Sequence, residues 1–167
     1  FWCNHFAIVD KFILPWFITG PYHREVIRPA LSGKFNDLLF NATISWAMIE
    51  NLDNDENVGP NSKRAHEDHR AGINENHARE LMELHSISPS AGYTQEDVIQ
   101  AAYIMSGWKH KWTEGRKKFN PVKFQQDCHQ RGKKIVMGKT YEGGKRELRA
   151  FTDNLANHPA CKKFIAT

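Results

Sequence analysis

Long apolar runs, cysteine pairs and nucleotide-binding motifs are all missing from this sequence. No run approaches the roughly 18 apolar residues that a membrane-spanning helix needs. The three cysteines, at positions 3, 128 and 161, have no CxxC spacing, which excludes a disulfide-dense scaffold. Only 11 glycines and 7 prolines occur in 167 residues, which excludes a collagen-like or low-complexity chain. The sequence also lacks the Walker A, GxGxxG and GxSxG patterns, so neither a phosphate-cradling loop nor a serine nucleophile elbow is expected.

The composition that is present indicates one globular domain of mixed polarity. Hydrophobic residues make up 40% of the chain and charged residues 25%, with a net charge of +4, which argues against disorder. Residues 1–6 are apolar and aromatic, and residues 161–167 enter an amphipathic helix. Both ends therefore suggest cuts through structure. We expect a single-domain fragment over 1–167, the central part of a longer chain whose remainder packs on both ends.

Apolar residues at helical spacing predict a mainly α fold. In residues 34–51 the apolar positions fall on one face, which predicts one helix there. Thr94 and Asp97 have the spacing of a capping box, which predicts a helix start at Thr94 and an end near Gly107. Asn74 or Asn76 is expected to cap the helix before it. The other predicted helices cover residues 1–18 (ending before Gly20-Pro21), 22–31 and 76–87, a segment after Gly143-Gly144, and a last one starting at Pro159.

Two polar stretches interrupt these helices. Residues 53–72 are mostly polar and without periodicity, which predicts a long loop. Residues 109–134 are basic and irregular, and residues 133–138 favour a short strand or hairpin arm. The predicted fold class is thus a mainly α, helical domain with a short β or irregular excursion near residues 119–142.

The densest group of chemically active side chains lies in the predicted helix 76–87. Glu80 or Glu83 would serve as a general base, and His85 as a ligand or proton carrier. His85 joined by His5 and His129 would form a ligand set for a divalent metal such as zinc. The competing interpretation is a buried polar network, in which Arg79 pairs with a carboxylate and His85 caps a carbonyl.

Three further groups have a surface or structural interpretation beside the chemical one. Cys128 next to His129 has the composition of an activated thiolate, although sequence neighbours need not touch. His66-Glu67-Asp68-His69 has metal-like composition but favours a solvated surface stretch. The basic residues 109–118 surround Trp112, yet the small net charge and absent motifs argue against a nucleic-acid partner. A solvated basic surface is favoured there, with an anionic polymer or lipid surface as an intermediate alternative.

Several motifs together resemble the bacterial DUF1800 family of unknown function, over essentially the whole chain. They are Phe1-Trp2-x-Asn4-His5-Phe6, Asn74-Glu75-Asn76-x-Ala78-Arg79-Glu80-Leu81-x-Glu83-Leu84-His85, Gly92-Tyr93-Thr94-Gln95-x-Asp97-Val98, Gly107-Trp108, Leu52-Asp53-Asn54 and His158-Pro159-Ala160. The resemblance implies a longer protein and an extracytoplasmic, periplasmic or secreted location. The chain departs from the family pattern at Cys3, where His is more usual, at His77, where Tyr is common, and at Cys128-His129-Gln130, where a His-Asp pair is frequent.

Two functional hypotheses follow. The first is an extracytoplasmic enzyme, a metal-assisted hydrolase using Glu80, Glu83, His85 and His5. The alternative is a non-catalytic binding or assembly module whose His, Glu and Asn network is structural.

Overall fold

The N-terminal third of the chain is a series of short helices. The computed structural model describes residues 1–9, 13–110 and 122–166. Helix α1 covers Trp2–His5, α2 covers Ile13–Tyr22, a π-helical turn covers His23–Ile27, and α3 covers Arg28–Ala30. The prediction of one helix over residues 1–18 that ends before Gly20-Pro21 is wrong, since α1 ends at His5 and α2 contains Pro21. A tertiary contact fixes the backbone beyond that proline, because the buried Tyr22 Oη donates to the Phe6 carbonyl at 3.2 Å.

The single helix predicted over 34–51 is in fact two, α4 (Phe35–Thr43) and α5 (Trp46–Asn51). Ser45 causes the break. Its Oγ donates to the Ala42 carbonyl at 2.7 Å and accepts from the Met48 N–H at 3.2 Å, so it closes one helix and caps the next. The apolar face itself is as predicted, since it supplies buried side chains from both helices: Leu38, Leu39, Ala42 and Ile49.

Residues 53–72 hold more structure than the predicted loop. They include a 3₁₀ turn at Asn54–Glu56 and helix α6 (Lys63–Glu67), and Asn57 forms a parallel bridge with Gly72. The buried Asn54 amide donates to the Trp108 carbonyl at 2.9 Å, and the Asn57 amide donates to the Ala102 carbonyl at 2.9 Å. These partners lie about 50 residues further along the chain, so local periodicity gives no sign of them.

The middle of the chain forms the predicted helix pair. Helix α7 covers Asn76–Glu83, a 3₁₀ turn covers Pro89–Ala91, and α8 covers Gln95–Met105. The Thr94 capping box is confirmed, with both reciprocal hydrogen bonds present. At the start of α7, Asn74 Oδ1 accepts from the Asn76 N–H at 3.0 Å, while the N-cap position belongs to Glu75.

The C-terminal third contains the short β excursion. Strand β1 (Trp108–Lys109) pairs antiparallel with β2 (Lys123–Phe124), and a 3₁₀ turn follows at Gln126–Cys128. Strands β3 (Lys134–Val136) and β4 (Lys139–Tyr141) form an antiparallel hairpin. Helices α10 (Glu147–Asn157) and α11 (Pro159–Ile165) complete the chain, and Pro159 occupies the predicted first position. The mainly α fold with a short β excursion is confirmed.

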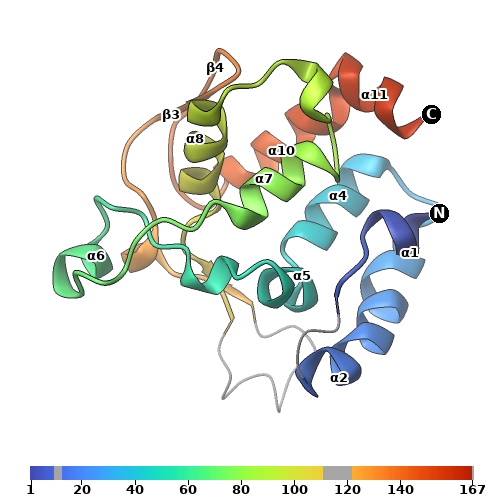
Figure 1. Ribbon diagram of the computed structural model, residues 1–167, viewed down its shortest axis with the longest axis horizontal. Coiled ribbons are helices and arrows are strands. Elements are labelled where there is room, and N and C mark those ends of the chain that lie inside the picture. Colours follow the sequence, from blue (N-terminus) through green and yellow to red (C-terminus); the bar gives the residue numbers. More distant parts are fainter. Residues whose placement is uncertain (10–12, 111–121, 167) are drawn as a thin grey trace.

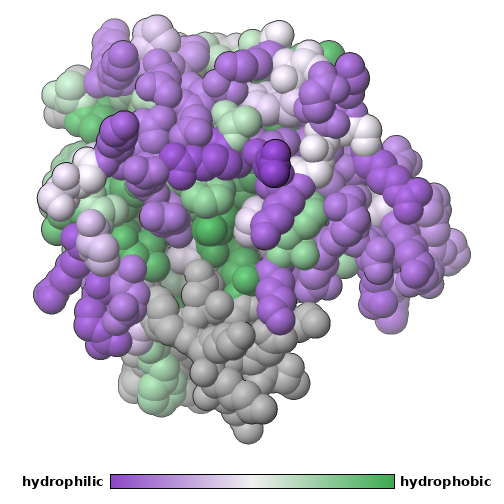
Figure 2. Space-filling model, turned by 180° about the vertical axis from the view of Figure 1, so that it is seen from behind, coloured by the Kyte–Doolittle hydropathy of each residue, from purple (hydrophilic) through white to green (hydrophobic). Residues whose placement is uncertain are grey.

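The core forms where α10 packs against α4 and α8, and α7 packs against α8 as well (Figure 1). Fully buried residues from these helices include Leu39, Leu81, Ala101 and Phe151. From behind, most of the surface is hydrophilic, with hydrophobic residues showing near its centre (Figure 2). No helix within the described ranges combines the length and apolar character needed to cross a membrane.

Candidate functional site

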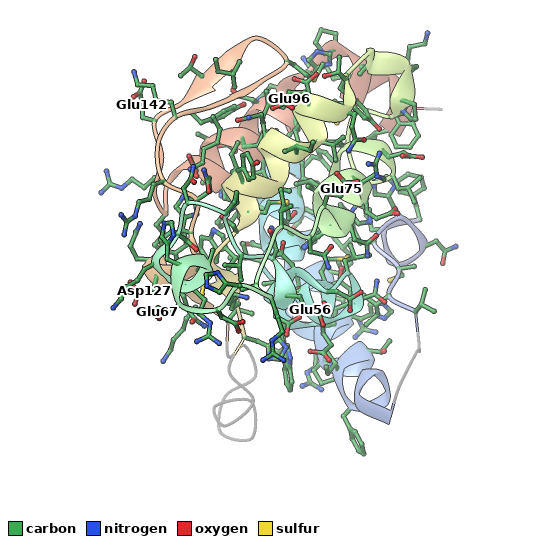
Figure 3. The ribbon with its side chains drawn as sticks, turned by 60° about the vertical axis from the view of Figure 1, so that its left-hand side comes forward. Glu56, Glu67, Glu75, Glu96, Asp127 and Glu142 are labelled. Carbon is green, nitrogen blue, oxygen red and sulfur yellow. The ribbon has the colours of Figure 1, made fainter. Side chains whose placement is uncertain are left out.

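Helix α7 directs His77 and Leu81 into the core, whereas Glu80 and Glu83 are only partly buried. At its start, the Arg79 guanidinium lies 2.7 Å from Glu75 Oε1, and Gln95 of α8 bonds to both residues at 2.7 Å. Glu75 can be followed at the beginning of α7 in Figure 3. The interpretation that Arg79 pairs with a carboxylate is confirmed, and the polar group joins two helix starts.

The structure brings His5 and His85 together where α1 meets the end of α7. His5 Nε2 donates to the His85 carbonyl at 3.0 Å, and the two ring centroids are 6.2 Å apart. The Phe6 ring lies 5.3 Å from the His85 ring. Burial, with a smaller contribution from His5, lowers the pKa of His85 to about 4, so its imidazole is neutral near pH 7. The carbonyl contact runs opposite to the predicted direction, because His85 supplies the carbonyl and His5 the ring.

His77 lies on the buried face of α7 and is deeper in the core than His5. Its side chain is 1% exposed, and neither ring nitrogen has a hydrogen-bond partner among the described residues. Burial, reinforced by His85, lowers its pKa to about 3. The imidazole is therefore a neutral polar ring in an apolar site, where its hydrogen-bonding capacity is unused.

His129 belongs to a different cluster. Its Nδ1 donates to the Ser106 carbonyl at 2.7 Å, and its Nε2 lies 2.7 Å from Glu147 Oε1. The Lys134 ammonium donates to the same Glu147 oxygen at 2.7 Å and to the Gln130 carbonyl at 2.7 Å. We call His129, Lys134 and Glu147 the buried ion cluster, since the three are at most 4% exposed.

The predicted ligand set of His5, His85 and His129 is not assembled. No group of three or more His, Cys, Asp or Glu side chains in residues 1–9, 13–110 and 122–166 could hold a metal ion. The physical reason is that the His129 ring is already engaged by Ser106 and Glu147. His5 and His85 remain neighbours, but as a pair.

Sequence reasoning missed the two other members of the buried ion cluster. Lys134 lies in a basic stretch, but it is two residues before the buried Val136 on strand β3. Side chains two apart on a strand face the same side of the sheet, so Lys134 faces the core as well. Glu147 shares the buried face of α10 with Leu148 and Phe151. Both positions were readable from strand and helix periodicity. Burial lowers the pKa of Lys134, and the hydrogen bond to Glu147 opposes that shift.

A second missed cluster lies beside β1. His110 Nε2 is 2.6 Å from Glu50 Oε2 and 3.5 Å from Asp55 Oδ2, and its side chain is 2% exposed. Lys109 Nζ donates to the Asp55 carbonyl. The rest of the basic stretch, from residue 111 on, lies outside the described residues.

The remaining sequence candidates occupy unremarkable places. The Cys128 thiol is buried, and the ring of His129 is bonded to other groups. In the 66–69 stretch His66, Glu67 and His69 are exposed, which agrees with the solvated-surface interpretation. Glu67 and Asp68 form surface pairs with lysine and arginine at 3.8 and 3.5 Å.

Comparison with known proteins gives one match. A family model described as "Protein of unknown function (DUF1800)" matches residues 1–167, the whole chain. No curated protein and no solved structure matches it.

Proposed function

The chain belongs to the DUF1800 family of proteins of unknown function, and from that premise we propose that it acts as a non-catalytic binding or assembly module. The buried ion cluster carries this proposal. Its donors reach main-chain carbonyls of Ser106 and Gln130, and its carboxylate belongs to α10. It therefore fastens the β3–β4 hairpin and the preceding loop to α8 and α10, which is a structural task.

The three predicted catalytic residues have positions that suit the same role. Glu80 and Glu83 are partly exposed on α7, whereas His85 is 6% exposed and packs on Phe6. A general base works within hydrogen-bond reach of its substrate. A neutral His85 packed between aromatic rings is better suited to holding α1 against α7 than to moving protons.

We also propose a location for the module. The resemblance to exported members supports an extracytoplasmic, periplasmic or secreted position. A binding role there is consistent with the net charge of +4, because basic proteins attract the anionic molecules of cell surfaces.

One observation favours a metal-assisted hydrolase as a second candidate. His5 and His85 are neighbours, and burial lowers the pKa of both, so both imidazoles are in the neutral form that binds metals. In that mechanism they would hold a divalent ion, which would supply an activated water, and Glu80 or Glu83 would accept its proton.

Elemental analysis of the dialysed full-length protein, together with complementation of a gene deletion, separates the two candidates. We expect the wild type and His85→Gln to be metal-free and folded. We also expect Glu80→Gln and Glu83→Gln to complement the deletion as well as the wild type does. A stoichiometric metal that disappears in His85→Gln, or failure of the folded glutamate variants to complement, would overturn the binding role in favour of the hydrolase.

A further inference from the structure

A pocket of about 310 Å³ lies between the β3–β4 hairpin and the second half of α10. Helix α10 runs between the hairpin and α11 (Figure 1), and His158 and Pro159 at the turn into α11 also line the pocket. The lining residues are Val136, Met137, Lys139, Tyr141, Phe151, Asn154, Leu155, Asn157, His158 and Pro159. This volume is at the small end of the range for ligand pockets, which is roughly 300–1,000 Å³.

The floor of the pocket is apolar and aromatic. Val136, Phe151 and Leu155 are buried core residues, and the Tyr141 ring meets the Phe151 ring edge-on at 5.6 Å. An apolar group that packs on this floor leaves water, and the free energy gained is in proportion to the apolar area that it buries. The body of a ligand that fits here is therefore a short hydrocarbon chain or a single ring.

One side of the pocket carries a chain of hydrogen bonds. Lys139 Nζ donates to Asn154 Oδ1, and Asn154 Nδ2 donates to Tyr141 Oη at 2.8 Å. Since the Tyr141 oxygen accepts here, its own hydrogen points elsewhere as a donor, and the Lys139 ammonium has further N–H groups. No acidic residue is present among the described lining residues, so the charge of this side is positive.

The walls are also held in place before any ligand arrives. The buried ion cluster fastens the base of β3 to α10 through Lys134 and Glu147. At the hairpin turn, the Met137 N–H donates to Asp97 Oδ1 of α8. A pocket whose walls are fixed on both sides avoids the free-energy cost of ordering on binding.

From these contacts we propose that the pocket binds a small anionic amphiphile, with an apolar body on Phe151 and Leu155 and a carboxylate facing Lys139 and Tyr141. The inference rests on the proposed binding function and names its ligand class. The apolar floor and the positive, donor-rich side are the two halves of that recognition.

Isothermal titration of the full-length protein with octanoate and with octanol tests the proposal. We expect saturable octanoate binding, and octanol binding at least tenfold more weakly. Lys139→Gln should weaken octanoate binding about tenfold, which corresponds to about 1.4 kcal/mol, and leave octanol binding unchanged. Lys133→Gln is the matched control, because Lys133 lies on the same hairpin and pairs with Glu142 outside the pocket.

Asn157→Trp provides a second variant that spares the core. Asn157 is exposed at the rim, so a large ring there should block the pocket and abolish binding while the melting temperature stays unchanged. The proposed ligand site would be wrong if the wild type does not bind octanoate, or if binding is unchanged in both Lys139→Gln and Asn157→Trp. Either of these results would reject the ligand class alone. The binding function itself would be rejected only by the metal and complementation results described above.

Discussion

Two regions of this molecule bury histidine side chains, and they differ in the groups that surround the imidazole rings. At the α1–α7 junction, His77 and His85 are buried and neutral, because burial disfavours the charged form of the imidazole. In the buried ion cluster, His129 lies against a carboxylate and a lysine, with main-chain partners for the remaining donors. Burial of a histidine therefore says little until its partners are known. One region should respond to pH and the other to the loss of a partner.

Removing the carboxylate of the buried ion cluster should have the largest effect. Glu147→Ala leaves the Lys134 ammonium buried without its counter-charge, and breaking such a pair costs about 3–5 kcal/mol. Urea unfolding at pH 7 measures this loss. Glu142→Ala is the control, because its pair with Lys133 is exposed and should contribute at most about 1 kcal/mol. Equal losses in the two variants would contradict the contrast between buried and exposed pairs.

Replacing both partners sharpens the same point. In the Lys134→Met and Glu147→Leu double variant no charge is left unpaired by this ion pair, so the loss should be much smaller than in Glu147→Ala. The coupling between the two sites can be measured as a double-mutant cycle. Additive losses would contradict a direct interaction.

Acid should destabilise the α1–α7 junction. The folded-state pKa values of His77 and His85, about 3 and 4, are lower than the unfolded value of 6.5. The unfolded chain therefore binds more protons between these values, so stability is complete above about pH 6.5 and falls as the pH drops toward 4. For the fully buried His77 alone the loss from pH 7 to pH 4 is about 3 kcal/mol. Urea midpoints across this range measure it.

A substitution at His77 isolates that contribution. His77→Phe removes the titrating group, so the fall in stability between pH 6.5 and 4 should become shallower. His66→Phe is the matched control, because His66 is exposed. An unchanged pH dependence in His77→Phe would show that the acid loss arises elsewhere.

At neutral pH the same variant should be more stable than the wild type. Both nitrogens of His77 are buried and have no hydrogen-bond partner in the part of the chain that the structure describes, and leaving such a group unsatisfied costs about 1–3 kcal/mol. Phenylalanine has a similar shape and needs no hydrogen bond, so we expect a gain of about 1 kcal/mol, measured by urea unfolding at pH 7.5. A loss would indicate overpacking beside Leu81 or Met82.

The sequence predicts local features of this fold better than its breaks. The Thr94 capping box and the strand or hairpin arm predicted over 133–138 depend on neighbouring residues, and both are present. The division at Ser45 was missed because an apolar face continues across it while the hydroxyl redirects the backbone. Helix propensity and apolar periodicity therefore do not predict the break at Ser45.

The residues of the candidate site also differ in how far the sequence could predict their contacts. His5 and His85 lie close together because the His5 ring at the end of α1 donates to the His85 carbonyl just after α7. His129 could not be assigned from the sequence, because its partners Ser106 and Glu147 lie 23 and 18 residues away on separate elements. Periodicity does indicate that Lys134 and Glu147 face inward, but it does not indicate that they meet.

The smallest expected effect comes from the exposed polar group at the start of α7. Glu75, Arg79 and Gln95 form the same kind of three-membered network as the buried ion cluster, with distances of 2.7 Å, but the Glu75 and Arg79 side chains are 37% and 36% exposed. Water can replace each partner there, so Glu75→Ala should cost at most about 1 kcal/mol and the loss should shrink further in 0.5 M salt. Urea unfolding at low and high salt measures both values. A loss comparable to that of Glu147→Ala would mean that network geometry, rather than burial, decides how much such a group stabilises this fold.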